Sequence, residues 1–338
     1  MARINRYLSL SNELERYLYQ NQRGNRLPSE EELARRFEAS KPTLRKALKI
    51  LKQKGLIQTE NGIGNTVLNH PATISKELIF FCSDLVFFAD TLKEFSIESA
   101  NNGYISSIIS LPPDSIMRER IFKTALQKKP AGIILYAGAE KKIDLPIPQN
   151  IPILHLVRRY SELRGDLLSF QNREAETAIV RKLYAEGCRR FALYGMEKIN
   201  PDAAEERKKG FLTGMKMVRL RPRNNSILLP SATEEQIEAF FQLFTDPKNC
   251  PDAVCCLNDH CAGDFLLEMN RRKLSVETLR ISGFDANGFT LFFPKRILTV
   301  KPPMEMLGKR AVELLIRRIE NTGLAEINEI LKSELVTI

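Results

Sequence analysis

Residues 27–69 read LPSEEELARRFEASKPTLRKALKILKQKGLIQTENGIGNTVLN, and this stretch decides the fold of the N-terminal part of the chain. Ser29 followed by Glu32 matches a capping box, in which the serine oxygen accepts the N3 amide and the glutamate reaches back to the serine amide. Ser40 is a second N-cap, and Pro42 is tolerated in the first turn of the helix that follows it. The spacing therefore predicts two capped helices joined by a tight turn.

The second of these helices, over about residues 41–54, is amphipathic. Its apolar and basic side chains fall on different faces at helical spacing: Leu44, Ala47, Leu48 and Leu51 on one, Lys41, Arg45, Lys49 and Lys52 on the other. A basic face is ordinarily just solvated, but the second helix of a tight pair can enter the major groove of duplex DNA. We therefore expect Lys41, Thr43 and Arg45 to contact base edges or phosphates.

A β-hairpin is predicted directly after this helix. Residues 56–59 suit a strand, Asn61-Gly62 is a strong tight-turn signal, and residues 66–68 suit the return strand. An ordinary hairpin is the plainer interpretation, but the position after a DNA-reading helix favours a wing. Its small, polar residues can approach a phosphate backbone or a minor groove, and the expected contacts are Gly62, Gly64, Asn65 and Thr66.

These features resemble the winged helix-turn-helix of the GntR family of bacterial transcription regulators, over nearly all of residues 1–69. The matching residues are Leu27-Pro28-Ser29-Glu30, Glu32-Leu33-Ala34, Ser40, Pro42-Thr43, Arg45, Ala47-Leu48, Gly55-Leu56-Ile57 and Gly62-Ile63-Gly64-Asn65-Thr66. The resemblance implies a domain that binds double-stranded operator DNA. Many members carry arginine where this chain has Glu31, at a position that often touches DNA, so no known operator sequence can be transferred to this chain.

The bulk composition agrees with a DNA-binding protein. The 338 residues carry a net charge of +10, and residues 1–70 alone hold 13 Lys and Arg against 7 Asp and Glu. No apolar run approaches the length of a membrane span, and the N-terminus lacks the apolar segment of a signal peptide. We therefore expect a cytoplasmic protein without a membrane partner.

The cysteines raise the question of a metal site. Cys250, Cys255, Cys256, His260 and Cys261 are close together in the sequence, but their spacing is not that of a zinc site. Two of the thiols lie in the strand-like run AVCCL, where successive side chains point to opposite faces. We expect buried free thiols, no metal and no cofactor.

Residues 70–75 are the expected linker, and residues 76–338 the expected effector-binding and dimerisation domain. Strand-like and helix-like segments alternate there, which predicts parallel sheets with helices on both faces. The expected fold class is α/β, with a winged helix-turn-helix before a two-lobed, Rossmann-like domain. The second lobe is expected to begin near Leu167, and a helix over 304–319 is the last element expected.

This second domain resembles the effector-binding domain of the LacI/GalR regulators, which is itself similar to periplasmic sugar-binding proteins. The resemblance rests on Phe87-Phe88-Ala89, Gly132-Ile133-Ile134, Glu206-Arg207, Gly210-Phe211, Leu257-Asn258-Asp259, Gly283-Phe284-Asp285, Thr299-Val300-Lys301-Pro302-Pro303 and Met306-Leu307-Gly308. It implies a homodimer whose effector contacts are Phe88, Arg207, Asn258 and Asp285. Each has a plainer alternative as a core, helix, cap or turn residue, and Asp259 is expected to be the N-cap of the next helix.

The domain order resembles that of arabinose-type repressors, which implies a repressor of carbohydrate-utilisation genes that a small sugar or sugar derivative releases. Two departures separate this site from the usual sugar contacts: Val157 stands where members often carry an acid, and the chain has no tryptophan. Arg158, Arg159 and Arg207 therefore keep an acidic or phosphorylated effector open. A DNA-binding dimer without an effector is a further alternative. We expect no enzyme and no catalytic residue, because the sequence has no nucleophile elbow, phosphate-binding loop or metal-ligand spacing.

Overall fold

The computed structural model describes residues 6–18, 26–60, 64–68, 76–138, 147, 151–160, 163–196, 200–246, 248–321 and 324–338. The chain forms two compact units: residues 1–77 with 123–131, and residues 78–122 with 132–338. The predicted linker, residues 70–75, lies outside the described residues.

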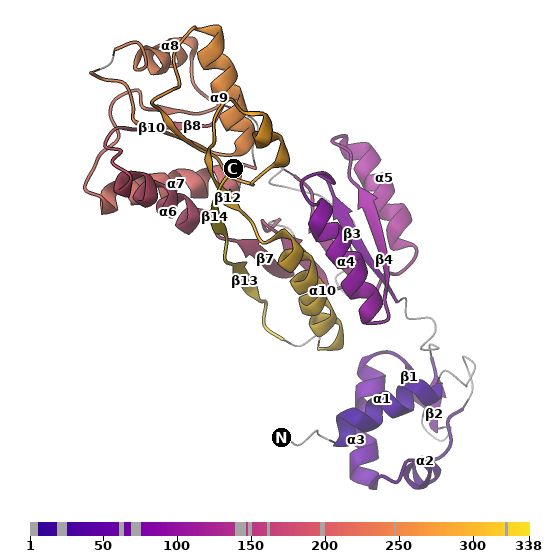
Figure 1. Cartoon of the computed structure of the whole chain (residues 1–338). Coiled ribbons are helices and arrows are strands. Elements are labelled where there is room, and N and C mark those ends of the chain that lie inside the picture. The colour runs from indigo at the N-terminus through magenta and orange to yellow at the C-terminus, as the bar shows by residue number, and fades with distance from the viewer. Residues whose placement is uncertain are drawn as a thin grey trace. The chain divides into compact units, whose positions relative to one another are not determined.

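In the described part of residues 6–68, the N-terminal unit has three helices followed by a two-stranded sheet (Figure 1). The helices are α1 (Arg6–Leu18), α2 (Glu30–Arg36) and α3 (Lys41–Gln53), and the strands are β1 (Ile57–Glu60) and β2 (Gly64–Val67). The strands pair antiparallel, with Ile57 opposite Val67. Leucines from all three helices form one buried core with the apolar ends of the hairpin, as expected of a winged helix-turn-helix.

The predicted helix starts of this unit are confirmed. The Ser29 backbone N–H donates to Glu32 Oε2 at 2.8 Å, and the Glu32 N–H donates to Ser29 Oγ at 3.2 Å, which completes the capping box of α2. The Ser40 side chain accepts from the Thr43 N–H at the start of α3. Two fixed helix starts and a short turn hold α2 and α3 as a rigid pair.

The larger unit consists of two lobes, each with a six-stranded sheet. In lobe 1 the strand order is β13-β7-β6-β5-β3-β4, and in lobe 2 it is β14-β12-β11-β10-β8-β9. Lobe 1 contains β3 (Glu77–Cys82), β4 (Ile105–Ser110), β5 (Gly132–Tyr136), β6 (Ile153–Leu156), β7 (Asp166–Phe170) and β13 (Asn328–Leu331). Lobe 2 contains β8 (Phe191–Tyr194), β9 (Ile227–Leu228), β10 (Ala253–Cys256), β11 (Arg280–Ser282), β12 (Leu298–Lys301) and β14 (Glu334–Thr337).

Helices connect these strands, as the alternating pattern predicts. Lobe 1 has α4 (Ala89–Asn101), α5 (Ser115–Leu126) and α10 (Met304–Glu320), and α10 packs on α4. Lobe 2 has α6 (Arg173–Ala185), α7 (Pro201–Met217), α8 (Glu234–Gln242), α9 (Asp259–Arg271) and the 3-10 helix η2 (Gly288–Phe292). The central strands run parallel, and β14 joins β12 antiparallel. The predicted α/β class is confirmed.

The chain crosses between the lobes three times: from β7 to α6, from β12 to α10 and from β13 to β14. The expectation that lobe 2 begins near Leu167 is therefore wrong, because β7 pairs with β6 in the sheet of lobe 1. The two last strands were not predicted. They are half-exposed edge strands with charged residues in their sequences, and such short segments lack the apolar run of a buried strand.

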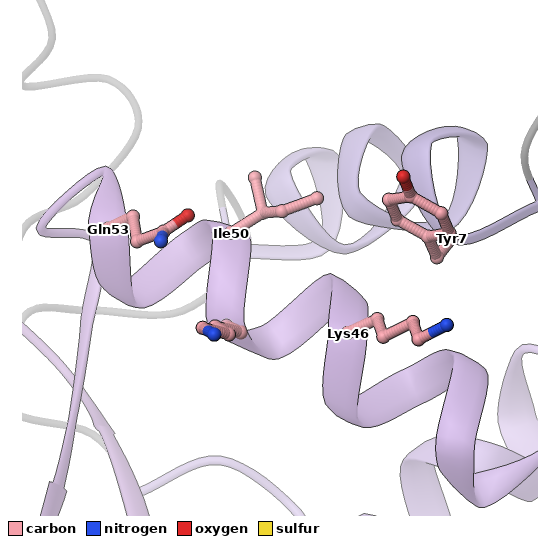
Figure 2. Close-up of a pocket in the computed structure, with 5 residues that line it drawn as sticks. Tyr7, Lys46, Ile50 and Gln53 are labelled. Atoms are coloured by element: carbon pink, nitrogen blue, oxygen red, sulfur yellow. The ribbon is translucent and has the colours of Figure 1, made fainter. Parts of the chain in front are cut away.

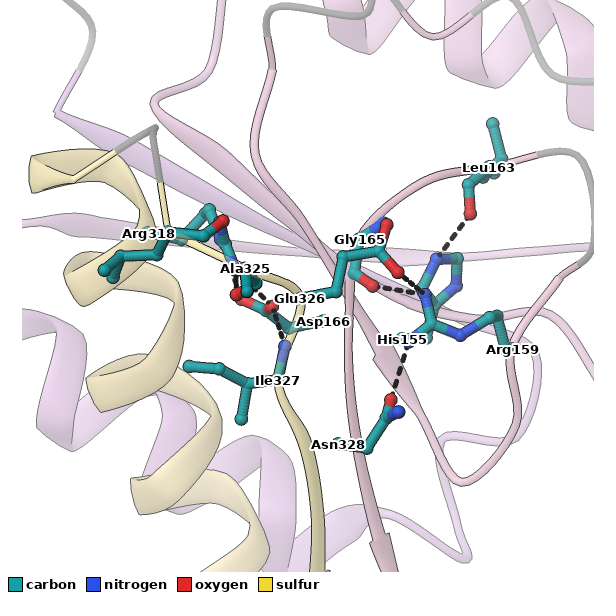
Figure 3. Close-up of polar contacts among 11 residues, drawn as sticks. His155, Arg159, Leu163, Gly165, Asp166, Arg318, Ala325, Glu326, Ile327 and Asn328 are labelled. Atoms are coloured by element: carbon teal, nitrogen blue, oxygen red, sulfur yellow. Dashed lines mark hydrogen bonds and ion pairs between the residues drawn. The ribbon is translucent and has the colours of Figure 1, made fainter.

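Polar contacts clamp the return segment after α10 to β7 (Figure 3). Arg318 on α10 forks onto the buried Asp166 carboxylate at 2.6 and 3.0 Å, and the Ile327 N–H donates to the same carboxylate at 2.8 Å. Arg159 donates to Glu326 at 3.0 Å and to Asn328 at 2.7 Å. These charge-assisted bonds fix the start of β13 beside β7.

Candidate functional site

The exposed face of α3 carries the three side chains predicted to contact DNA. Arg45 Nε lies 2.8 Å from the Glu30 carboxylate, and Lys41 Nζ lies 3.8 Å from that of Glu31. The Thr43 hydroxyl lies 2.8 Å from that of Ser40. Ion pairs between exposed side chains contribute little stability, so both cations can exchange their carboxylate partners for phosphates.

The hairpin places three of its four predicted contacts on β2, and the fourth, Gly62, lies outside the described residues. Gly64 has a φ of +99°, and Asn65 and Thr66 follow it in the strand. The Thr59 hydroxyl donates to Asn65 Oδ1. Arg26, which the sequence analysis did not identify, forms an isolated antiparallel β-bridge with Thr66 through its backbone. Its guanidinium lies against Gly64. The hairpin therefore has a cation beside it.

A groove of about 290 Å³ runs along α3 beside α1, lined by Tyr7, Lys46, Lys49, Ile50 and Gln53 (Figure 2). Lys46 Nζ lies 5.7 Å from the centroid of the Tyr7 ring. Lys46 was missed at the sequence level, although it follows Arg45 and precedes Lys49 by three residues. It belongs to the same exposed basic surface, which is therefore wider than the Lys41-Arg45-Lys49-Lys52 stripe.

In the larger unit, Arg207 and Asp285, two of the predicted effector contacts, lie next to each other. Arg207 comes from α7 and is 3% exposed, and its Nη2 lies 3.3 Å from Asp285 Oδ1. Its Nε donates to Asn172 Oδ1 at 2.9 Å, and its Nη1 donates to the Leu257 carbonyl at 2.6 Å. The guanidinium also lies 3.5 Å above the Phe284 ring centroid. The residues just before α6, just after β10 and just after β11 thus hold the planar guanidinium of Arg207 in place.

Asp285 lies just beyond β11 in a backbone conformation that favours glycine. The φ of Asp285 is +105° and that of Ala286 is +49°. The Asp285 N–H donates to the Val300 carbonyl at 2.8 Å. Burial raises the pKa of Asp285 to about 6, while the Arg207 guanidinium acts in the opposite direction. Strained backbone of this kind concentrates at ligand-binding sites, and carboxyl ends of parallel strands are where α/β proteins bind ligands.

Asn258 is a helix cap in the structure, whereas the resemblance implied an effector contact. Its side chain accepts from the Cys261 N–H at 2.7 Å, so Asn258 is the N-cap of α9, and the expectation that Asp259 caps this helix is wrong. The Asp259 carboxylate instead accepts from the Thr299 hydroxyl and the Asn287 N–H, each at 2.7 Å. Burial raises the pKa of Asp259 to about 7. Asp259 thereby anchors the loop that contains Asp285.

Phe88, the fourth predicted effector contact, lies in the core of lobe 1. It is fully buried, and its ring centroid lies 4.5 Å from that of Tyr136 and 4.8 Å from that of Phe87. Of the two phenylalanines, Phe88 is therefore the core residue, and its ring packs against that of Tyr136. Asn172, just before α6, was missed as a partner of Arg207, because contacts between distant elements leave no local pattern.

Other kinds of site find little support in the described part of the chain. No group of three or more potential metal ligands occurs there. Cys255 and Cys256 are buried, and desolvation raises the pKa of each thiol well above its usual value. Among the described helices, none is long and apolar enough to span a membrane.

Comparisons with known proteins match both units. Residues 9–67 match the gntR family of bacterial regulatory proteins, and residues 180–337 match the periplasmic binding protein-like domain. Over 356 aligned residues the chain is 25% identical to the arabinose metabolism transcriptional repressor of Geobacillus stearothermophilus, covering 96% of this chain and 94% of that protein.

Solved structures share the fold of the larger unit. A periplasmic binding protein/LacI transcriptional regulator from Alkaliphilus metalliredigens, complexed with D-xylulofuranose, matches with a TM-score of 0.60 and 21% identity over 78% of this chain and 97% of that one. A LacI family regulator from Enterococcus faecium with bound ribose matches with a TM-score of 0.60 and 18% identity over 77% and 96%.

Proposed function

We propose that the chain is a transcription regulator, which joins a GntR-like winged helix-turn-helix to a periplasmic-binding-protein-like domain, and that it is a repressor which a small sugar releases from operator DNA. The observation that carries the proposal is the coexistence of two structures in one chain. One is a basic α3 at helix-turn-helix geometry, and the other is a buried Arg207–Asp285 pair at the carboxyl ends of parallel strands.

For the DNA-binding unit, we propose that α3 enters the major groove while the hairpin lies against the adjacent backbone. Lys41, Thr43 and Arg45 occupy the first turns of α3, which is the end that contacts base edges in helix-turn-helix proteins. Lys46 and Lys49 extend the basic surface toward the phosphates. Their contribution would be sequence-independent, because phosphate contacts position a protein without reading bases.

For the effector, we propose that Arg207 and Asp285 bind neighbouring hydroxyl groups of a sugar. A guanidinium donates and a carboxylate accepts, so the pair matches a diol with both functions. Asn172 orients the arginine from the segment that joins the lobes. Asn258 contributes indirectly, by fixing the start of α9. A ligand that binds one lobe arrangement better than another shifts the population toward that arrangement, and this shift would lower DNA affinity.

We also propose that the protein is a homodimer formed through lobe 1. Its edge strand β4 and neighbouring helices carry exposed large apolar side chains: Ile97, Ile105, Ile108, Ile116 and Met117. Exposed large apolar side chains on neighbouring elements support an interaction surface there. A dimer would present two reading heads to two half-sites about 34 Å apart on one face of the duplex.

The test begins with selection of binding sites from a random duplex library by the full chain, followed by fluorescence anisotropy on the selected duplex. Arg45→Ala should weaken binding at least about tenfold, whereas Lys93→Ala, an exposed cation on α4, should not. A panel of pentoses and hexoses is then titrated into the complex, and at least one should release the DNA. Unchanged affinity for Arg45→Ala would refute the DNA-reading surface; failure of every sugar would leave a DNA-binding protein without a sugar effector.

A further inference from the structure

Arg158 and Asp202 form an ion pair that joins the two lobes. Arg158 follows β6 in lobe 1, and Asp202 lies in the first turn of α7 in lobe 2. Their side chains meet at 3.0 Å, between Arg158 Nη2 and Asp202 Oδ2. The arginine side chain is 3% exposed, whereas that of the aspartate is 50% exposed. A buried guanidinium thus has a carboxylate partner on the solvent side.

The backbone before Arg158 is built to aim this side chain. Val157 has a φ of +65°, and the Arg158 N–H donates to the Leu156 carbonyl at 2.7 Å, which closes a three-residue turn. A β-branched residue in the left-handed region is a steric outlier. The Val157 N–H also donates to the Leu168 carbonyl at 2.8 Å, so pairing with β7 holds the turn in place. Strain that the surrounding structure enforces is a mark of a functional position.

On the other lobe, the start of α7 fixes the position of Asp202. Asn200 caps α7 and accepts from the Asp202 N–H at 3.0 Å. Arg207 lies farther along the same helix, so α7 carries both the partner of Arg158 and the proposed hydroxyl-binding guanidinium. Asp84 adds negative charge near Tyr136 and Asp285.

The charges around this boundary are therefore matched. Arg158 lies against Asp202 and Arg207 against Asp285, so neither guanidinium offers an uncompensated positive charge to a phosphate or carboxylate. An anion at Arg158 would have to displace Asp202 and would meet its repulsion at hydrogen-bond distance. An uncharged polyhydroxyl ligand has neither cost.

We infer that Asp202 is a specificity-determining residue, which makes the lobe boundary select an uncharged effector by occupying the guanidinium of Arg158. This inference rests on the proposed effector site and narrows its ligand class to unphosphorylated, non-acidic sugars. Of the three arginines that suggested an acidic effector, Arg158 is then a lobe-bridging residue and Arg207 is paired with Asp285. Arg159 donates to Glu326 and to Asn328.

Inorganic phosphate tests the inference without knowledge of the natural effector. Calorimetric titration of the full chain at constant ionic strength should show at least about tenfold tighter phosphate binding in Asp202→Asn than in the wild type, because a charge that repels the anion is gone. Asp202→Ala should behave alike, and Asp202→Glu should keep the wild-type exclusion. The gain should vanish in the double variant Arg158→Gln/Asp202→Asn.

Glu235→Gln is the matched control, because it removes a carboxylate from the same position of the helix N-terminus in α8. It should leave phosphate binding unchanged. Equal phosphate affinity in the wild type and Asp202→Asn, or a gain that persists in the double variant, would overturn the inference. This outcome is separate from the sugar-release experiment: a sugar can release DNA while phosphate binding ignores Asp202, and that result would retain the proposed function and reject the specificity role.

Discussion

Glu176 is a buried acid whose removal should stabilise the protein in a pH-dependent way. It lies on α6 and is fully buried, and neither of its carboxyl oxygens receives a hydrogen bond from a nitrogen or oxygen donor among the described residues. Desolvation raises the pKa of Glu176 to about 8, against an ordinary value of 4.5, and the nearby Arg207 opposes this only in part. The folded protein therefore keeps this carboxyl protonated near neutral pH, whereas the unfolded chain ionises it.

The sign follows from proton binding. Between pH 4.5 and 8 the folded state holds one more proton here than the unfolded state, so this residue makes the free energy of unfolding fall as pH rises. One pKa unit corresponds to about 1.4 kcal/mol. Relative to a glutamate that stays protonated in both states, the free energy of unfolding is lower by about 1 kcal/mol at pH 5.5 and by about 3 kcal/mol at pH 7.

Glu176→Gln keeps the shape and cannot ionise. We expect the free energy of unfolding of this variant, relative to the wild type, to rise by about 2 kcal/mol between pH 5.5 and 7. For a domain of this size that is a relative shift in Tm on the order of 4 °C. A constant offset from the buried amide cancels in the comparison of the two pH values.

Differential scanning calorimetry of the full chain at the two pH values measures this difference. Glu174→Gln is the control, since Glu174 is exposed on the same helix and should give nearly parallel Tm curves. If the Glu176→Gln and wild-type curves were also parallel, the carboxyl would be titrating normally, and the reasoning from burial would be refuted.

Three further predictions concern the other sites. Sugar-induced release of DNA should weaken as pH falls through about 6, because protonated Asp285 loses its charge as a hydroxyl acceptor; the pH profile of Asp285→Asn should lack this step. Arg318→Ala should lower the free energy of unfolding by about 3–5 kcal/mol, because it leaves the buried Asp166 carboxylate without its cationic partner. Arg317→Ala, at an exposed position of the same helix, should change the free energy of unfolding by less than about 0.5 kcal/mol. Equal shifts in Tm for the two variants would contradict this prediction. Lys46→Ala should weaken binding to all duplexes alike and reduce the slope of log affinity against log salt by about 1; an unchanged slope would remove Lys46 from the phosphate contacts.

Local signals predicted the fold of the N-terminal unit well. The capping box at Ser29, the cap at Ser40 and the apolar stripe of α3 act within a few residues, and the structure confirms each of these elements. Most strands of the larger unit are short apolar runs, which also follow from the sequence. The same logic did not find β13 and β14, because edge strands need no continuous apolar run.

Long-range contacts explain the errors at the candidate effector site. Asn258 and Asp259 are both acceptable helix caps, and only the partners of Asp259, Thr299 and Asn287, show that this carboxylate serves elsewhere. Phe87 and Phe88 look equivalent in the sequence, yet the core takes only one of them fully. The meeting of Arg158 with Asp202 depends on how the two lobes come together, which no local pattern encodes.

The third crossing between the lobes sets a limit on their motion. Only Lys332 and Ser333 separate β13, in the sheet of lobe 1, from β14, in the sheet of lobe 2. The three Cα steps from Leu331 to Glu334 can extend to at most about 11 Å. The bridge therefore acts as a short tether, and its length, more than its sequence, governs how far the lobes can separate while both strands stay paired. Inserting glycines into it would lengthen the tether and leave the proposed ligand contacts untouched.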